Sequence, residues 1–201
     1  MILYAESNFI LELAFQQEEV EYCRELIALG NGTIKLVVPS FAITEPYWTL
    51  ESRIRERKQL YQRFQNETVQ LLRSGSYSAH KERFDQVRDI LVDSIEIQKK
   101  SLDEITNAIL QSSEVIPLDA DLVARALDSK DKFGLTPQDA FIFASVMSHA
   151  EERKGAKCFV TTNRKDFENP DLESELERVS CKLLTKFEHC LGYIRSNLKG
   201  N

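Results

Sequence analysis

The chain has no long apolar segment, and its first residues do not resemble a leader that carries proteins across membranes. Its longest apolar runs, such as residues 141–144 and 36–38, fall far short of the ~20 residues that a membrane-spanning helix needs. The first four residues carry no basic charge, which a signal peptide requires. We therefore expect a cytoplasmic protein with no membrane partner.

The chain also lacks paired cysteines, clustered histidines and glycine-rich motifs. Its 4 cysteines form no CxxC pair and its 3 histidines stand apart in the sequence. Free cysteine behaves as a small hydrophobic residue, so we expect reduced cysteines in the core. Isolated histidines argue against a zinc-type site. The absence of a phosphate loop and of the GxGxxG and GxSxG motifs excludes nucleotide-fuelled and serine-hydrolase chemistry, which leaves oxygen ligands as the main chemical resource.

Glycine and proline are scarce, with 7 and 5 residues respectively. Together with 42% hydrophobic and 29% charged residues, this composition excludes low-complexity or collagen-like segments. A length of 201 residues suffices for one well-buried domain with an elaboration. We expect residues 1–201 to form a single domain.

The charge is unevenly distributed along the chain. A net charge of -6 argues against a protein that coats nucleic acid through bulk electrostatics. However, residues 51–113 contain 11 basic and 10 acidic residues, whereas the rest of the chain has 15 and 22. This segment includes a locally basic helical stretch formed by Arg53, Arg55, Arg57, Lys58 and Arg63. The stretch is either a solvated helix face or a ridge that contacts phosphate.

Short apolar runs alternate with helical patterns along most of the chain. The predicted strands are residues 1–5, 34–38, 115–118, 158–160 and 181–184. The first predicted helical pattern covers residues 8–29 and ends at the Gly30-Asn31-Gly32 break. The later predicted helices are residues 48–73, 84–109 and 122–130 and a helix that begins at Thr136. Because parallel neighbours need crossover helices, this alternation predicts an α/β sandwich with three layers and a central, mostly parallel five-stranded sheet.

The segment 51–113 is unusual because its apolar residues recur every three or four positions across two long helices. The pattern predicts a helical hairpin that forms an insertion or arm within the domain, or two long helices in the layers of the sandwich.

Four polar residues lie where a strand passes into a helix, or just inside the helix that follows: Glu6, Glu45, Asp139 and Asn163. In open α/β sheets the carboxyl ends of the strands line one crevice, so residues distant in sequence converge there. Like charges in a shared cleft repel and raise each other's pKa. A hard divalent cation with oxygen ligands would turn the same cluster into a phosphate-handling site.

Each of these residues also has a structural interpretation. Ser7 or Asn8 could cap the first helix, with Glu6 favouring its dipole. Glu45 could be an exposed first-turn carboxylate, and Pro46 after it predicts a kink or a late helix start. Asp139 could reciprocate an N-cap at Thr136 in a weak capping box.

The set of motifs resembles the PIN-domain nucleases, including the VapC-like toxin ribonucleases. Glu6-Ser7-Asn8 matches the strand that ends in an acid and a small hydroxyl residue, with Glu for the usual Asp. Glu45 matches the helical acid after strand two, and Asp139-Ala140 matches the opening of the central helix. Thr161-Thr162-Asn163 and Asp166-Phe167 match the turn after strand four, with Thr162 for the usual Arg. The resemblance extends from residue 1 to about 185.

The resemblance implies a PIN-like fold and a metal-dependent ribonuclease of the kind that serves as the toxin of a toxin-antitoxin pair. It implies one or two Mg²⁺ or Mn²⁺ ions held by Glu6 and Asp139, with Asn163, Asp166 and Glu45 around them. Such an ion lowers the pKa of a bound water that attacks the scissile phosphate in line. It further implies an antitoxin protein as a partner and a homodimer, although no residue pattern fixes either.

The expected substrate is single-stranded or looped RNA. The residues expected to contact it are Ser7, Asn8, Thr161, Arg53, Arg55, Arg57 and Lys58. Two alternatives stay open. One is a PIN-like scaffold with weak or no activity that binds a protein or RNA partner through its helical arm. The other is a receiver-like phosphoryl-transfer domain, which is disfavoured because Asp119 has a ready N-cap role and no paired acid follows the first strand.

Overall fold

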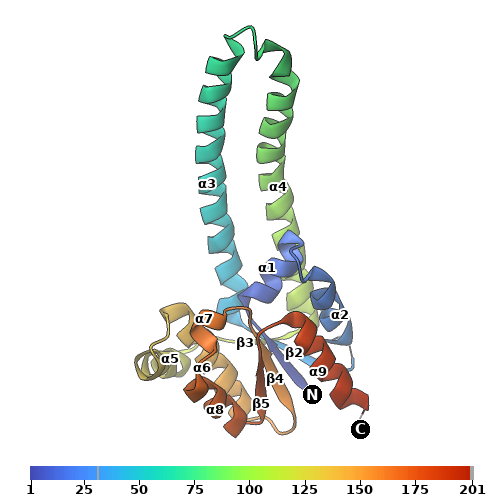
Figure 1. Cartoon of the computed structure of the whole chain (residues 1–201). Helices are drawn as coiled ribbons and strands as arrows, with labels where there is room; N and C mark the ends of the chain where they lie inside the picture. Colours follow the sequence, from blue (N-terminus) through green and yellow to red (C-terminus); the bar gives the residue numbers. More distant parts are fainter. Residues whose placement is uncertain (31, 200–201) are drawn as a thin grey trace.

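The computed structural model describes residues 1–30 and 32–199 and contains a five-stranded parallel sheet between two layers of helices (Figure 1). The strands are β1 (Ile2–Ala5), β2 (Lys35–Pro39), β3 (Glu114–Ile116), β4 (Lys157–Val160) and β5 (Cys181–Leu184), in the order β3-β2-β1-β4-β5. Every neighbouring pair is parallel. The predicted α/β fold class and its five strands are therefore confirmed.

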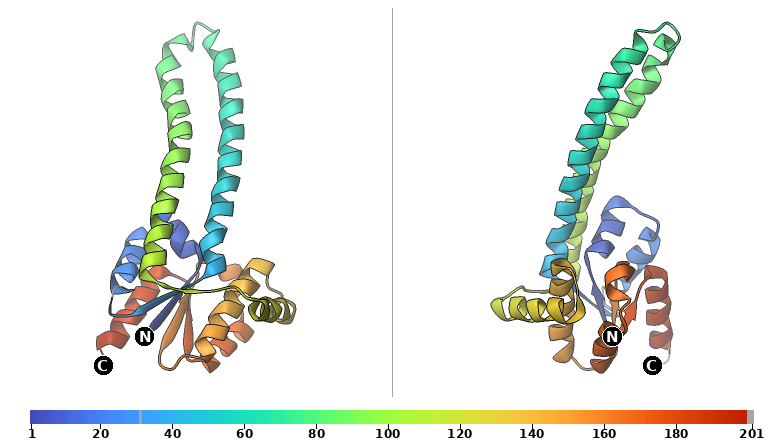
Figure 2. Two further views of the ribbon diagram at one scale, coloured as in Figure 1. Left: turned by 180° about the vertical axis from the view of Figure 1, so that it is seen from behind. Right: turned by 60° about the vertical axis from the view of Figure 1, so that its left-hand side comes forward.

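Helices form the connections between these strands. They are α1 (Ser7–Phe15), α2 (Val20–Gly30), α3 (Ser40–Leu72), α4 (Lys81–Ser112), α5 (Ala120–Phe133), α6 (Pro137–Glu151), α7 (Arg164–Phe167), α8 (Pro170–Arg178) and α9 (Phe187–Lys199). Helices α1, α2 and α9 lie on one side of the sheet, and α6 and α8 lie on the other, with α5 packed against α6 (Figure 2). The strand order reverses between β1 and β4, which creates a crevice at their carboxyl ends.

The central strands are buried on both faces, which explains their continuous apolar character. All four residues of β1 and of β4 are buried, and the core continues into the inner faces of the flanking helices. The four cysteines are free and buried, as predicted. Within residues 1–30 and 32–199, no helix is both long enough and apolar enough to cross a membrane.

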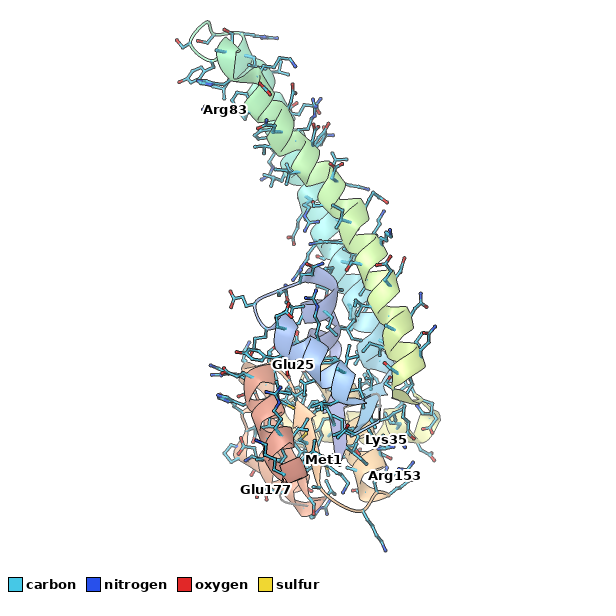
Figure 3. All side chains as sticks on the ribbon, turned by 90° about the vertical axis from the view of Figure 1, so that its right-hand side faces the viewer. Met1, Glu25, Lys35, Arg83, Arg153 and Glu177 are labelled. Atoms are coloured by element: carbon cyan, nitrogen blue, oxygen red, sulfur yellow. The ribbon has the colours of Figure 1, made fainter. Side chains whose placement is uncertain are left out.

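Helices α3 and α4 form a long hairpin that rises well beyond the sheet (Figure 1). At about 1.5 Å per residue, each helix is roughly 50 Å long. Burial is confined to the base: the buried side chains of α3 end at Ile54, and those of α4 begin at Leu102. Farther out the two helices touch through partly exposed residues, such as the pair Phe64 and Phe84, whose ring centroids are 5.9 Å apart. Figure 3 shows Arg83 near the far end of this arm.

Two of the predicted helices have different limits in the structure. The pattern over residues 8–29 is two helices, because the chain turns at Gln16, which adopts the left-handed conformation at φ 50°. Helix α3 begins at Ser40 rather than near Trp48, so Pro46 lies inside it and a late start is wrong. Of the predicted break at Gly30-Asn31-Gly32, Asn31 lies outside the described residues.

Candidate active site

Three carboxylates from separate parts of the chain line one hollow at the carboxyl ends of the strands. Glu6 follows β1 directly, Glu45 is on α3, and Asp139 is the third residue of α6. The hollow has a volume of about 350 Å³. We call it the acid hollow; its lining is Glu6, Ser7, Asn8, Leu11, Glu45, Thr49, Asp139, Thr162 and Asn163. None of the described residues that line it is basic.

Local structure explains how each acid reaches this place. Glu6 occupies the N-cap position of α1, but its side chain caps no backbone group and is directed to other side chains instead. Glu45 lies on the second turn of α3, half-buried rather than an exposed first-turn acid. Asp139 is held by the N-cap of α6, where its backbone N–H donates to Thr136 Oγ1 over 3.3 Å.

The capping interaction at α6 does not remove Asp139 from the hollow. Thr136 Oγ1 donates to Asp139 Oδ2 over 2.5 Å. The predicted mutual interaction of Thr136 and Asp139 is therefore made with the threonine hydroxyl. The other carboxylate oxygen, Oδ1, accepts from Asn163 Nδ2 over 3.0 Å. Asn163 in turn follows β4, and its backbone N–H donates to Thr161 Oγ1 over 3.0 Å. The turn after β4 therefore orients the acid that opens α6.

Ser7 connects the other two acids. Its Oγ is 2.8 Å from Glu6 Oε2 and 2.5 Å from Glu45 Oε2. A hydroxyl has a single hydrogen, so Ser7 donates to one carboxylate at a time, and the second short contact needs a proton on a carboxyl group. Asn8 Nδ2 fixes the remaining oxygen of Glu6 by donating to Oε1 over 2.7 Å.

Burial and mutual repulsion disfavour the charged forms of all three acids. Burial raises the pKa of Glu6 to about 7, against the lowering effect of hydrogen bonds from Ser7, Thr161 and Asn8 and with a further rise from Glu45. The pKa of Glu45 is raised by burial and by Asp139. That of Asp139 is raised by burial and by the nearby Asp166. Among the residues that line the hollow, no positively charged side chain offsets the negative charge of these three carboxylates.

A family model described as PIN domain matches residues 3–167. The chain belongs to the PIN domain family. PIN domains are generally nucleases and typically use divalent metal ions. Among solved structures, the chain is similar to one chain of the crystal structure of VapBC2 from Rickettsia felis bound to a DNA fragment from their promoter. That alignment has 12% sequence identity and a TM-score of 0.49, and it covers 92% of this chain and 98% of the other. No curated protein matches the sequence.

The donor atoms of this PIN domain suit a hard divalent cation. Carboxylate, amide and hydroxyl oxygens surround the hollow, and Mg²⁺ binds such ligands while keeping several waters and using only one or two carboxylates. Among residues 1–30 and 32–199, no three Asp, Glu, His or Cys side chains lie close enough to chelate one ion together. The residues therefore fit an ion held partly through water rather than in an all-protein cage.

The remaining predicted site residues are distributed more widely. Ser7, Asn8 and Asn163 line the hollow, and Thr161 is buried beside Glu6. Asp166 lies near enough to Asp139 to affect its pKa, but it does not line the hollow. The sequence analysis missed Leu11, Thr49 and Thr162 as lining residues. The first two could have been found, because each lies one helical turn after a predicted site residue.

The four basic residues predicted to guide RNA lie on α3 outside the hollow. Arg53 stacks over the Phe15 ring at 4.7 Å from its centroid. Arg57 and Lys58 line a separate groove of about 530 Å³ between α3 and α4. Arg55 is exposed and lies about 15 Å along the helix from Glu45. The four side chains are thus spread around α3 rather than forming one ridge.

Proposed function

We propose that the protein is a metal-dependent endoribonuclease that hydrolyses RNA phosphodiester bonds in the acid hollow. The observation that carries this proposal is the meeting of Glu6, Glu45 and Asp139 in one hollow whose lining, within residues 1–30 and 32–199, includes no basic side chain. Three acids with raised pKa in one place cost folding energy unless a cation compensates them. Membership of the PIN family supports the same function.

Each residue of the site has a separate role in this proposal. Glu6, Asp139 and Asn163 would hold an Mg²⁺ or Mn²⁺ ion, and Glu45 and Asp166 would add negative charge near it. The ion would supply a water of lowered pKa and polarise the scissile phosphate. Ser7 transfers its single hydrogen bond between two carboxylates as their protonation changes.

The amide groups around the hollow position the acids. Asn8 holds Glu6, and the Asn163 side-chain N–H holds Asp139, so each carboxylate keeps one oxygen directed by a fixed donor. The Asn163 amide oxygen stays available for the ion or a water. Ser7 and Asn8 line the hollow and would contact the substrate there, whereas the predicted contact Thr161 is fully buried and would not. Arg55 and Lys58 would attract the substrate's phosphates from α3.

The test is cleavage of a labelled single-stranded RNA by the purified protein in Mg²⁺ or Mn²⁺, with EDTA as the metal-free control. We expect internal cleavage that requires the ion. No cleavage in either metal, with the protein folded and RNA intact, would contradict the proposal.

In the cell, we propose that this activity is that of a toxin restrained by an antitoxin protein. Expression of the chain alone should then arrest growth, and the Asp139→Asn variant at equal abundance should not. The expected homodimer would be seen as a doubled mass in light scattering. Growth arrest by both the wild type and Asp139→Asn would show that toxicity does not depend on the acid hollow.

A PIN-like scaffold without activity is the second candidate. It is favoured by the absence of a three-ligand cluster in the part of the chain that the structure describes, and by apolar side chains such as Leu60, Ile90 and Ile97 exposed on the hairpin. A titration with Mn²⁺ separates the two candidates. An ion that binds only the folded state should add about 2.7 kcal/mol of stability at 100 times its Kd. No shift in the melting temperature would favour the scaffold.

A further inference from the structure

An aromatic cluster adjoins the acid hollow and has no role in the proposal so far. Trp48 is 58% exposed, and its indole packs edge-on against Phe41, with ring centroids 5.7 Å apart and an interplanar angle of 73°. Phe41 in turn stacks on Phe141, at 5.3 Å and 27°. Two partly buried phenylalanines thus hold a third aromatic ring out toward solvent. We call Phe41, Trp48 and Phe141 the aromatic platform.

The platform and two of the acids share the same helices. Phe41, Glu45 and Trp48 are spaced four and three residues apart on α3, so their side chains lie on one face of that helix. On α6, Phe141 follows Asp139 by two residues. Thr49, the neighbour of Trp48, lines the acid hollow itself. The platform therefore lies at the rim of the hollow, about one helical turn from Glu45.

Core packing does not account for Trp48. The buried face of α3 consists of Ala42, Ile43, Pro46, Leu50 and Ile54, and Trp48 falls on the opposite side of the helix. It is also the only tryptophan of the chain. A large ring held in water beside a set of uncompensated acids has the location expected of a ligand contact.

We infer that the aromatic platform stacks an unpaired base of single-stranded RNA whose backbone phosphate lies in the acid hollow. Every base has a π face that stacks on aromatic side chains, whereas bases inside a duplex are not available for such contact. This inference rests on the proposed nuclease function, which it deepens by assigning a substrate-positioning surface.

Charge on the same face of α3 fits this ligand. Arg55 lies seven residues beyond Trp48, two turns along one face and about 10 Å away. It is exposed and takes part in none of the ion pairs that the described residues form. A strand that stacks one base on Trp48 would bring a neighbouring phosphate to Arg55. Phosphate contacts of this kind position a strand without reading its sequence.

Because Trp48 is the sole tryptophan, its fluorescence reports the contact directly. The experiment titrates the full-length protein with a short single-stranded RNA, with Ca²⁺ in place of Mg²⁺, and confirms on a gel that the RNA stays intact. We expect strong quenching of Trp48 and little quenching by the same sequence as a duplex. Binding measured by anisotropy of a labelled RNA should weaken about tenfold in Trp48→Ala, in line with the loss of one stacked base. Trp48→Tyr should recover most of the affinity.

The matched control is Tyr77→Ala, which removes another exposed aromatic side chain from the far end of the hairpin. It should bind RNA as the wild type does. In cleavage assays Trp48→Ala should raise KM. A Trp48→Ala protein with unchanged affinity and KM, equal quenching by duplex RNA, or a loss of self-association instead of RNA binding would each overturn the inference. Quenching by RNA without cleavage in Mg²⁺ or Mn²⁺ would instead refute the nuclease proposal and leave the platform standing.

Discussion

The acids at the two ends of helix α6 differ in whether positively charged side chains surround them. At its amino end, Asp139 meets Glu6 and Glu45 in a hollow that no basic side chain lines in the part of the chain that the structure describes, and the pKa of each acid is raised. About 15 Å along the helix, His149 lies beside Glu114 of β3, whose pKa is lowered. Helix α6 therefore separates acids that have no positively charged neighbour in the hollow from an acid, Glu114, that is paired with basic side chains.

Two cationic side chains and one histidine surround Glu114. Lys35 Nζ of β2 is 2.5 Å from its Oε2, His149 Nε2 is 3.4 Å from the same oxygen, and Arg153 after α6 is 3.5 Å from Oε1. Figure 3 shows Lys35 and Arg153 on the same side of the α/β body. Tyr4 completes the group with a 2.8 Å hydrogen bond between its hydroxyl and His149 Nδ1. The contrast teaches that this chain can neutralise a half-buried acid, so the lack of compensation in the hollow indicates a ligand from outside.

The largest expected effect comes from Asp139. The Asp139→Asn variant keeps the side-chain size but removes the charge that would hold the cation. We expect RNA cleavage to fall on the order of 1,000-fold, about 4 kcal/mol of transition-state stabilisation, in single-turnover assays. Glu114→Gln is the matched control at the other end of α6 and should cleave normally. If Asp139→Asn keeps the wild-type rate, the two ends do not differ in function.

The second prediction concerns the stability of the metal-free protein. Burial raises the pKa of Glu6 in the folded protein to about 7, from 4.5 for an ordinary glutamate, so the folded state binds more protons between these two pH values. Stability should therefore fall as pH rises from about 4.5 to about 7, by about 3 kcal/mol in total. Urea unfolding in EDTA at several pH values measures this loss. Glu6→Gln should flatten the profile, and an unchanged slope in that variant would assign the titration to another group.

The smallest effect is expected at Glu114, where the lowered pKa gives the opposite sign. The carboxylate contributes stability above its unfolded pKa, and this contribution is lost as pH falls through the lower folded value. Because Glu114 is partly exposed, Glu114→Gln should cost only about 1 kcal/mol or less at pH 7. Thermal unfolding at pH 7 and at acid pH compares the two. A variant more stable than the wild type at pH 7 would show that this acid, too, is uncompensated.

Much of the fold could be read from sequence because local rules and burial agreed. Thr136, Pro137 and Asp139 mark the start of α6, and the structure places them at N-cap, first and third positions. Continuous apolar runs predicted doubly covered strands. Local sequence rules failed at two places. No glycine marks the turn at Gln16, which adopts the left-handed conformation and divides the predicted first helix. Pro46 does not delay the start of α3 but lies inside that helix.

The candidate site was predictable in outline and not in its contacts. Strand-end placement predicted that Glu6 and Asp139 would meet, and they line one hollow. Sequence did not show that Ser7 lies between Glu6 and Glu45, because that contact spans 38 residues and depends on where α3 starts. The sequence also did not show that Trp48 lies at the rim, because a tryptophan on a helix can face either the core or the solvent.

By itself the sequence determined the alternation of strands and helices, the cap of α6, and a composition richer in oxygen ligands than in histidine or cysteine, because these follow from local propensity and composition. Only the tertiary structure decided which acids share a hollow and which acid is surrounded by cations. Charge compensation depends on distances of a few ångströms between segments far apart in the chain, and those distances are fixed by how the layers pack.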